Sequence, residues 1–242
     1  MKMKKELFVS LLAGFSLFVV TAADSATLHQ NPSQTGVIYD TDTVSTWQTN
    51  GNSMTGMLVT VNFLSGDTET VVWNAGGSGT GAVGTGWSLG LTDFTANTFY
   101  QTQWLFDVDG RNEVTGFSID AIAGNTVFDA VYDLSNNGTP GSELGHAVDL
   151  DTFGRSWEVD TAYDGDVYVT YSGEVHLNST WYEDLYQTLT IDFGQGVFGA
   201  NDVLAFYADT DNLRDPVPEP GTIILFGAGL MLLAGGRMTR KK

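Results

Sequence analysis

The chain has 242 residues, a formal net charge of −19 at pH 7 and no cysteine. This acidity argues against DNA, RNA and anionic lipid as binding partners, because their phosphates would repel the protein. The lack of cysteine excludes disulfide bonds, so the folded part must be stabilised by its core, helped by any metal ion it binds.

The N-terminus has the order of a secretory signal peptide. Three lysines lie within residues 1–5, an apolar run covers residues 7–20, and small residues gather at 22–26. A positive end, an apolar run and small residues before the cleavage point define such a peptide. The apolar run is short for a membrane span, so we expect residues 1–26 to be a signal peptide that signal peptidase cuts after Ala22, Ala23 or Ala26. The alternative is a retained N-terminal anchor.

Residues 27–215 have the length of one sandwich-sized domain. They hold 26 acidic residues against three arginines, a net charge of −23, and no lysine. The apolar content of the chain, 42%, is that of a globular protein and argues against disorder. Basic residues therefore gather at the two ends of the chain. Under the positive-inside rule, both ends start in the cytoplasm and the acidic body between them is exported.

Short β-rich segments recur along this body and are separated by turns of Gly, Asn, Asp and Ser, such as Ser65-Gly66-Asp67. Only residues 181–187 have a pattern that fits a short helix. Many short strands with regular turns predict an all-β fold, a jelly-roll-like antiparallel β-sandwich flanked by an N-terminal signal helix and a C-terminal transmembrane helix. The strands expected in chain order are residues 58–63, 68–73, 99–108, 114–120, 126–132, 167–171, 189–193 and 203–207.

The body offers few residues for catalysis. Its three histidines, His29, His146 and His176, lie outside any recognisable motif, and no Gly-x-Ser-x-Gly sequence occurs. We therefore expect the body not to be an enzyme. Glycoside hydrolysis needs only two carboxylates, so a glycoside hydrolase remains the less favoured alternative.

Aspartates alternate with other residues at two places. Asp107, Asp109 and Glu113 form one group, and Asp209 and Asp211 form the other. Calcium takes six to eight oxygen ligands, so both groups are candidate calcium ligands. The first group is not an EF-hand loop, since its glycine is at the fourth position. The alternative is that these residues only make turns on a lysine-free surface.

Six tryptophans, which can stack on sugar rings, support a second alternative, a carbohydrate-binding module. Most tryptophans in a sandwich are expected to pack in the core, so the one or two that are exposed would matter. The six are Trp47, Trp73, Trp87, Trp104, Trp157 and Trp181.

The C-terminus has three parts in order. Pro218-Glu219-Pro220 comes first, and an apolar stretch over residues 221–236 follows. As a helix this stretch would rise about 24 Å, against a hydrocarbon core of about 30 Å, so it spans marginally. A basic cluster after an uncharged apolar run is a stop-transfer pattern. The cluster consists of Arg237, Arg240, Lys241 and Lys242.

Residues 216–242 resemble the PEP-CTERM sorting signal, a tail also catalogued in some proteins as an ice-binding protein C-terminal domain. The resemblance implies recognition by an exosortase, a membrane-embedded transpeptidase-like enzyme that cuts near the motif. It also implies a Gram-negative host that makes exopolysaccharide or biofilm matrix. The precursor would be anchored transiently in the inner membrane, and its final place would be the periplasm, the outer surface or the matrix. We therefore expect a structural or adhesive protein that works with exopolysaccharide.

Overall fold

The computed structural model describes most of the body and neither end of the chain. The predicted signal peptide and the predicted sorting tail lie outside the described residues, as do Trp47 and Trp157. For residues 28–32, 45–46 and 158–160 only the backbone is described. The described residues are 28–32, 38–41, 43–46, 49–75, 81–99, 101–110, 112–130, 138–142, 145–148, 158–160, 165–194, 198–199 and 202–213.

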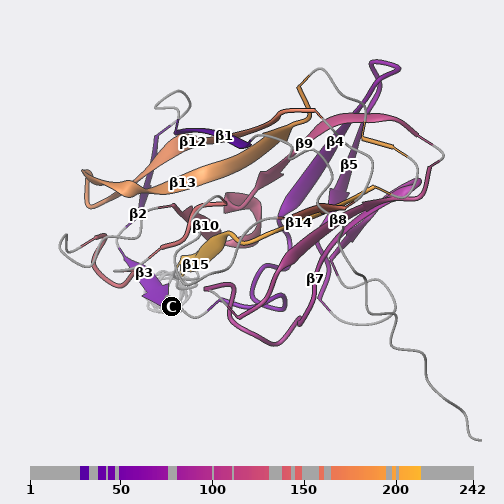
Figure 1. The fold of residues 1–242 in the computed structure, drawn as a ribbon. Helices are drawn as coiled ribbons and strands as arrows, with labels where there is room; N and C mark the ends of the chain where they lie inside the picture. Colours follow the sequence, from indigo (N-terminus) through magenta and orange to yellow (C-terminus); the bar gives the residue numbers. More distant parts are fainter. Residues whose placement is uncertain are drawn as a thin grey trace, which may run out of the picture.

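The described residues form two β-sheets that pack face to face (Figure 1). One short 3₁₀ turn, η1 (Ile122–Gly124), joins two strands. The smaller sheet has the order β11 (Glu158–Asp160), β14 (Val203–Phe206), β8 (Trp104–Val108), β7 (Trp87–Leu91) and β6 (Ala82–Val83). The larger sheet holds β1 (Leu28–Pro32), β2 (Tyr39–Thr41), β3 (Val44–Thr46), β4 (Leu58–Phe63), β5 (Thr68–Val72), β9 (Val114–Asp120), β10 (Thr126–Asp129), β12 (Val167–Leu177), β13 (Thr180–Asp192) and β15 (Asp209–Leu213).

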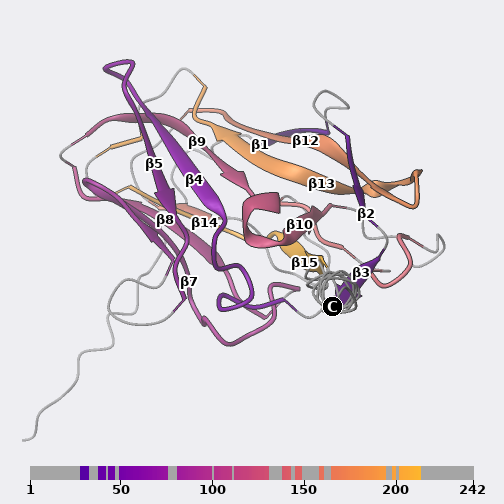
Figure 2. The same cartoon turned by 180° about the vertical axis from the view of Figure 1, so that it is seen from behind.

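The long hairpin of β12 and β13 lies in the larger sheet, and the view from behind shows its two strands side by side (Figure 2). Its turn at Asn178 and Ser179 has positive φ at both residues, 49° and 64°, as a tight hairpin with right-handed strand twist requires. One half of β13 pairs with β10 and the other half with β9. The sheet then continues through β4 to β5, and on its other side through β10 and β15 to β3. Most pairings are antiparallel, but β1 and β2 run parallel to β12.

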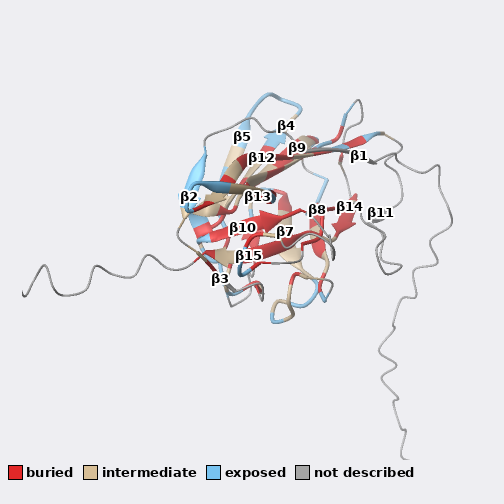
Figure 3. Cartoon of the chain, turned by 90° about the vertical axis from the view of Figure 1, so that its left-hand side faces the viewer, coloured by how far each residue is buried: buried red, intermediate tan, exposed pale blue. Residues whose placement is uncertain are grey.

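The core lies between the two sheets, where Figure 3 shows the buried residues. Along β12, buried residues alternate with more exposed ones, so one face of the strand points inward. Aromatic rings fill the interior: the Phe106 and Phe117 rings are 4.3 Å apart, and those of Phe193 and Phe198 are 4.2 Å apart. A buried aromatic core of this kind replaces the disulfides that the chain does not have.

The predicted all-β sandwich is confirmed, but several details differ. The parallel pairing of β1 and β2 with β12 departs from the expected antiparallel arrangement, and the strand expected at 99–108 begins at Trp104. Residues 181–187, which fitted a short helix, belong to strand β13. Asp209 and Asp211, expected in a turn, lie in strand β15. The expected flanking helices at the two ends lie outside the described residues.

Candidate functional site

A row of small hydroxyl side chains crosses the outer face of the larger sheet. Strand register aligns Thr170 of β12 with Thr190 of β13, and Thr190 with Ser118 of β9. Ser118 is aligned with Thr60 of β4, and Thr60 with Thr70 of β5. We call these five residues the hydroxyl row. Neighbouring strands lie about 4.8 Å apart, so the row extends over about 19 Å.

The hydroxyl row is accessible and carries no charge. Thr70 is exposed, and the other four side chains are half-buried, as expected for short side chains on a sheet. The Thr60 and Thr70 hydroxyls lie 2.9 Å apart and form a hydrogen bond. Acidic Asp120 and Asp192 lie in the register positions on either side of the row. The row is therefore an uncharged band on an acidic protein, and each hydroxyl both donates and accepts hydrogen bonds.

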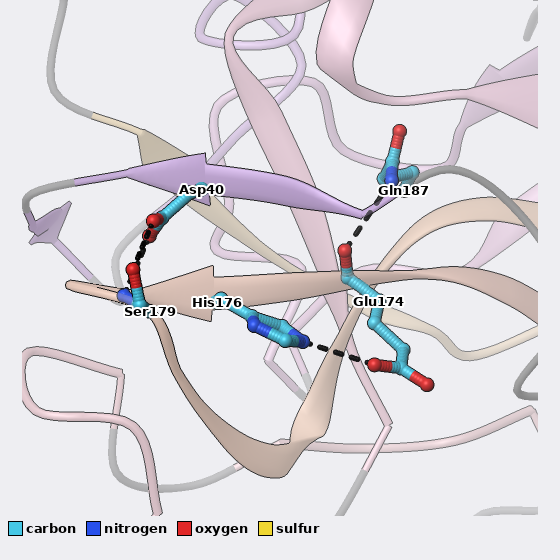
Figure 4. Close-up of polar contacts among 5 residues, drawn as sticks. All are labelled: Asp40, Glu174, His176, Ser179 and Gln187. Carbon is cyan, nitrogen blue, oxygen red and sulfur yellow. Dashed lines mark hydrogen bonds and ion pairs between the residues drawn. The ribbon is translucent and has the colours of Figure 1, made fainter.

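A polar group lies at the far end of the same hairpin (Figure 4). The His176 Nε2 is 2.9 Å from Glu174 Oε2, and the Gln187 amide donates to the Glu174 carbonyl. Asp40 of β2 accepts hydrogen bonds from both the amide and the hydroxyl of Ser179. These bonds, led by that of the Ser179 amide, hold the pKa of Asp40 below its usual value. The contacts tie β2 to the hairpin turn.

The described tryptophans are mostly core residues. Trp73, Trp87 and Trp104 are buried, and their indole N–H groups donate to Gly51 O, Glu69 Oε2 and Ala208 O. Trp181 is half-exposed, with its ring stacked on His176 at a centroid distance of 6.4 Å. Among the tryptophans with described side chains, Trp181 alone is not fully buried.

Four aspartates are buried together where β10, β13 and β15 meet: Asp129, Asp184, Asp209 and Asp211. We call them the carboxylate cluster, and none is more than 3% exposed. Asp129 and Asp209 are direct cross-strand partners. Asp209 and Asp211 are two residues apart on β15 and so point to the same side of the sheet. The predicted candidates Asp209 and Asp211 therefore lie in the interior.

Residues of 138–142 and 145–148 are hydrogen-bonded to the cluster. The Asp184 carboxylate accepts hydrogen bonds from the amide and the hydroxyl of Thr139, each 2.6 Å long. Asp129 Oδ2 accepts a hydrogen bond from the Ser142 hydroxyl. The His146 amide donates to Asp129 O, and the Asp209 amide donates to His146 O. The backbone of His146, one of the three histidines considered in the sequence, thus bridges β10 and β15.

The two aspartates of β15 have strongly perturbed acidity. Burial raises the pKa of Asp211 to about 8; the nearby Ser142 hydroxyl lowers it, and the charge of Asp184 raises it further. Burial also raises the pKa of Asp209 well above its usual value, and the charges of Asp211 and Asp129 raise this pKa further. The cause is that a charged carboxylate in the interior has lost its water without gaining a counter-ion.

The other predicted calcium candidates lie apart from this cluster. Asp107 is an exposed residue of β8, and Asp109 and Glu113 are exposed in the loop that leads from β8 to β9. Across the described ranges, no three Asp, Glu or His side chains are grouped closely enough to hold a metal ion by themselves. Calcium binding at either group therefore stays a prediction.

Sequence reasoning missed Asp129 and Asp184. Asp129 ends a buried strand, and Asp184 lies in the segment that resembled a helix. Neither belongs to an acidic pattern along the chain; pairing between distant strands brings them beside Asp209 and Asp211. The other histidines are accounted for only in part, because His29 is described by its backbone alone.

The described part of the chain contains no helix long and apolar enough to cross a membrane. The predicted membrane segment at 221–236 lies outside it, as do Pro218, Glu219 and Pro220 and the basic cluster at the C-terminus.

Comparisons with known proteins bear on the tail alone. No curated protein and no solved structure was found to match the chain. Residues 216–241 match the PEP-CTERM protein-sorting motif. This span includes Pro218, Glu219 and Pro220 and all of the basic cluster except Lys242. The chain thus carries a PEP-CTERM sorting motif, which implies an exported, membrane-anchored precursor that an exosortase processes.

Proposed function

We propose that the body is a non-enzymatic matrix protein that binds a neutral exopolysaccharide through the outer face of its larger sheet. The observation that carries this proposal is the hydroxyl row. A polysaccharide presents many hydroxyls, and a row of regularly spaced hydroxyls offers it donors and acceptors in alternation. The row is uncharged, whereas the body around it is strongly acidic, which favours a neutral polymer over an anionic one.

The glycoside hydrolase alternative needs two carboxylates that flank the substrate. The four aspartates of the carboxylate cluster are each at most 3% exposed, so a polysaccharide cannot reach them, and this alternative would have to use Asp120 and Asp192 on either side of the hydroxyl row. A carbohydrate-binding module differs from the proposed matrix role chiefly in affinity and would use the same face, with Trp181 at its end.

The proposal is tested by co-sedimentation of the full chain, in detergent, with exopolysaccharide purified from the host's own matrix. The test variant replaces Thr60 and Thr190 with Val, which keeps the shape and a good strand propensity but removes two hydroxyls. Each lost hydrogen bond is worth about 0.5–1.5 kcal/mol, so we expect binding to weaken about tenfold or more.

A matched control replaces Thr55 and Thr95 with Val. Both are exposed threonines in turns outside the row, and this variant should bind like the wild type. Absence of binding by the wild type, or equal loss in both double variants, would contradict the proposal. Time-dependent release of reducing sugar would favour a glycoside hydrolase instead.

A further inference from the structure

The carboxylate cluster has oxygen atoms that the protein leaves without partners. Both oxygens of Asp211 and Oδ2 of Asp209 are buried and accept no hydrogen bond. Asp184 shows that this is not the rule in the cluster, because Thr139 satisfies both of its oxygens. The Ser142 hydroxyl, next to Asp211, is bonded to Asp129 instead. A buried acceptor with no partner costs about 1–3 kcal/mol, and a charged one costs more.

No lysine or arginine is present among the described residues to neutralise the four aspartates. Their polar neighbours are hydroxyls and main-chain groups: Thr98 donates to Asp209 Oδ1 over 3.1 Å, and the Thr210 amide donates to the same oxygen over 2.8 Å. The atoms that the four aspartates themselves offer are all oxygens. A negatively charged set of oxygen ligands suits a hard cation such as calcium better than a soft metal.

We propose that the carboxylate cluster binds a divalent cation, calcium in the first instance, with Asp211 and Asp209 as its principal ligands. Their three unpartnered oxygens would coordinate the cation, whose positive charge would neutralise the buried carboxylates. Carboxylates alone do not complete such a site in the described part of the chain. Calcium takes six to eight oxygens and accepts hydroxyl, carbonyl and water ligands, so groups such as the Ser142 hydroxyl would supply the rest. The ion would fasten residues 138–142 onto β10 and β15 through Ser142. This proposal does not depend on polysaccharide binding.

The first test measures thermal unfolding of the full-length chain in detergent, in chelator, in calcium chloride and in sodium chloride of equal ionic strength. An ion that binds only the folded state shifts the folding equilibrium about 100-fold when its concentration is 100 times Kd. We expect calcium to raise Tm by several degrees. Sodium should do little, because general screening does not depend on a specific site.

The second test uses terbium as a luminescent substitute for calcium. The Trp104 indole donates to Ala208 O over 2.9 Å, and Ala208 precedes Asp209 in the chain. A terbium ion at the cluster would therefore receive energy from excited Trp104 and emit light. We expect tryptophan-sensitised emission in the wild type, and its loss when calcium displaces terbium.

Two matched variants locate the site. Asp211→Asn keeps the shape of the side chain and should abolish both the rise in Tm and the terbium signal. Asp107→Asn removes an exposed candidate and should change neither. Asp209→Asn provides a second buried variant if Asp211→Asn does not fold. The proposal is overturned if calcium gives the wild type no advantage over sodium, if Asp211→Asn and Asp209→Asn retain the gain, or if Asp107→Asn alone loses it.

Discussion

Asp184 and Asp211 are equally buried but differ in their partners. The Thr139 amide and hydroxyl replace the water that Asp184 has lost. The Ser142 hydroxyl is close enough to Asp211 to lower its pKa, but its hydrogen bond goes to Asp129, so neither oxygen of Asp211 has a partner; the charge of Asp184 raises the pKa of Asp211. A buried carboxylate without partners is stable only as the neutral acid or beside a cation. The pH dependence of stability therefore reports whether Asp211 is protonated, charged or bound to a cation.

In the presence of a chelator, we expect the free energy of unfolding to fall as pH rises from 5 to 8. The pKa of Asp211 is about 8 in the folded chain and about 3.9 when unfolded. Between these values the folded state keeps a proton that the unfolded state has released. Stability then decreases with rising pH, by at most about 1.4 kcal/mol per pH unit for one proton. Urea denaturation at pH 5, 6.5 and 8 measures the slope.

Asp211→Asn should reduce this slope and should be more stable than the wild type at pH 8. Asparagine carries no titrating proton, and replacing Asp211 removes a charge that raises the pKa of Asp209. Asp107→Asn, at an exposed position, should leave the slope as it is. A wild-type slope that persists in Asp211→Asn would mean that other groups titrate in this range.

At the scale of elements, the packing of Gly145 on β10 leaves no room for a side chain. A Cβ on Gly145 would overlap Oδ1 of Asp129 and lie 2.6 Å from its backbone oxygen. Gly145→Ala should therefore destabilise the protein by about 1–3 kcal/mol, the usual cost of forcing extra atoms into a packed site. Gly199→Ala is the matched control: its Cβ would have no atom within 4 Å, so its effect should stay within about 0.5 kcal/mol. Equal effects of the two substitutions in urea denaturation would contradict this account.

The elements also show what the sequence can and cannot predict. Strands β4 and β9 were predicted at their observed bounds, because their apolar and β-branched residues alternate. In residues 181–187, apolar side chains at 181, 182, 185 and 186 imitate a helical face. Hairpin pairing with β12 nevertheless makes this segment part of a continuous strand, with a bulge in the pairing and a φ of 68° at Glu183. Pairing with the hairpin partner, and with β10 at residues 185 and 186, overrides a local pattern of this length.

The candidate site was predictable only in part for the same reason. The Asp-x-Asp alternation drew attention to Asp209 and Asp211, but Asp and Asn have low strand propensity, so the segment suggested a turn. Its burial follows from pairing with β10, whose residues lie about 80 positions earlier in the chain. That pairing also brings Asp129 opposite Asp209. The hydroxyl row likewise needs the register of five strands, and no single segment of the chain contains it.

At the scale of the whole molecule, most acidic residues lie in the body and most basic residues lie at the two ends of the chain. The chain carries 29 acidic residues against 10 basic ones, and seven of the basic ones lie outside residues 27–215. Some of the body's acids are withdrawn from the surface into the carboxylate cluster. A net charge this far from zero favours solubility but makes the folded body repel itself. A cation bound at the cluster would relieve part of that repulsion inside the fold.

The PEP-CTERM motif at 216–241 predicts how the chain is exported, anchored and cut. Removal of residues 216–242 should release the body in soluble form, because the marginal membrane segment and its basic stop are both lost. In an exosortase-deficient strain the full chain should stay uncut and membrane-bound.

Replacing Pro218 and Pro220 with Ala separates the two roles of the tail: the apolar segment and Arg237 remain, so this variant should be anchored but not cut. Fractionation and immunoblotting of each strain give size and location together. Unchanged size and location of the wild-type chain without exosortase would contradict sorting through this tail.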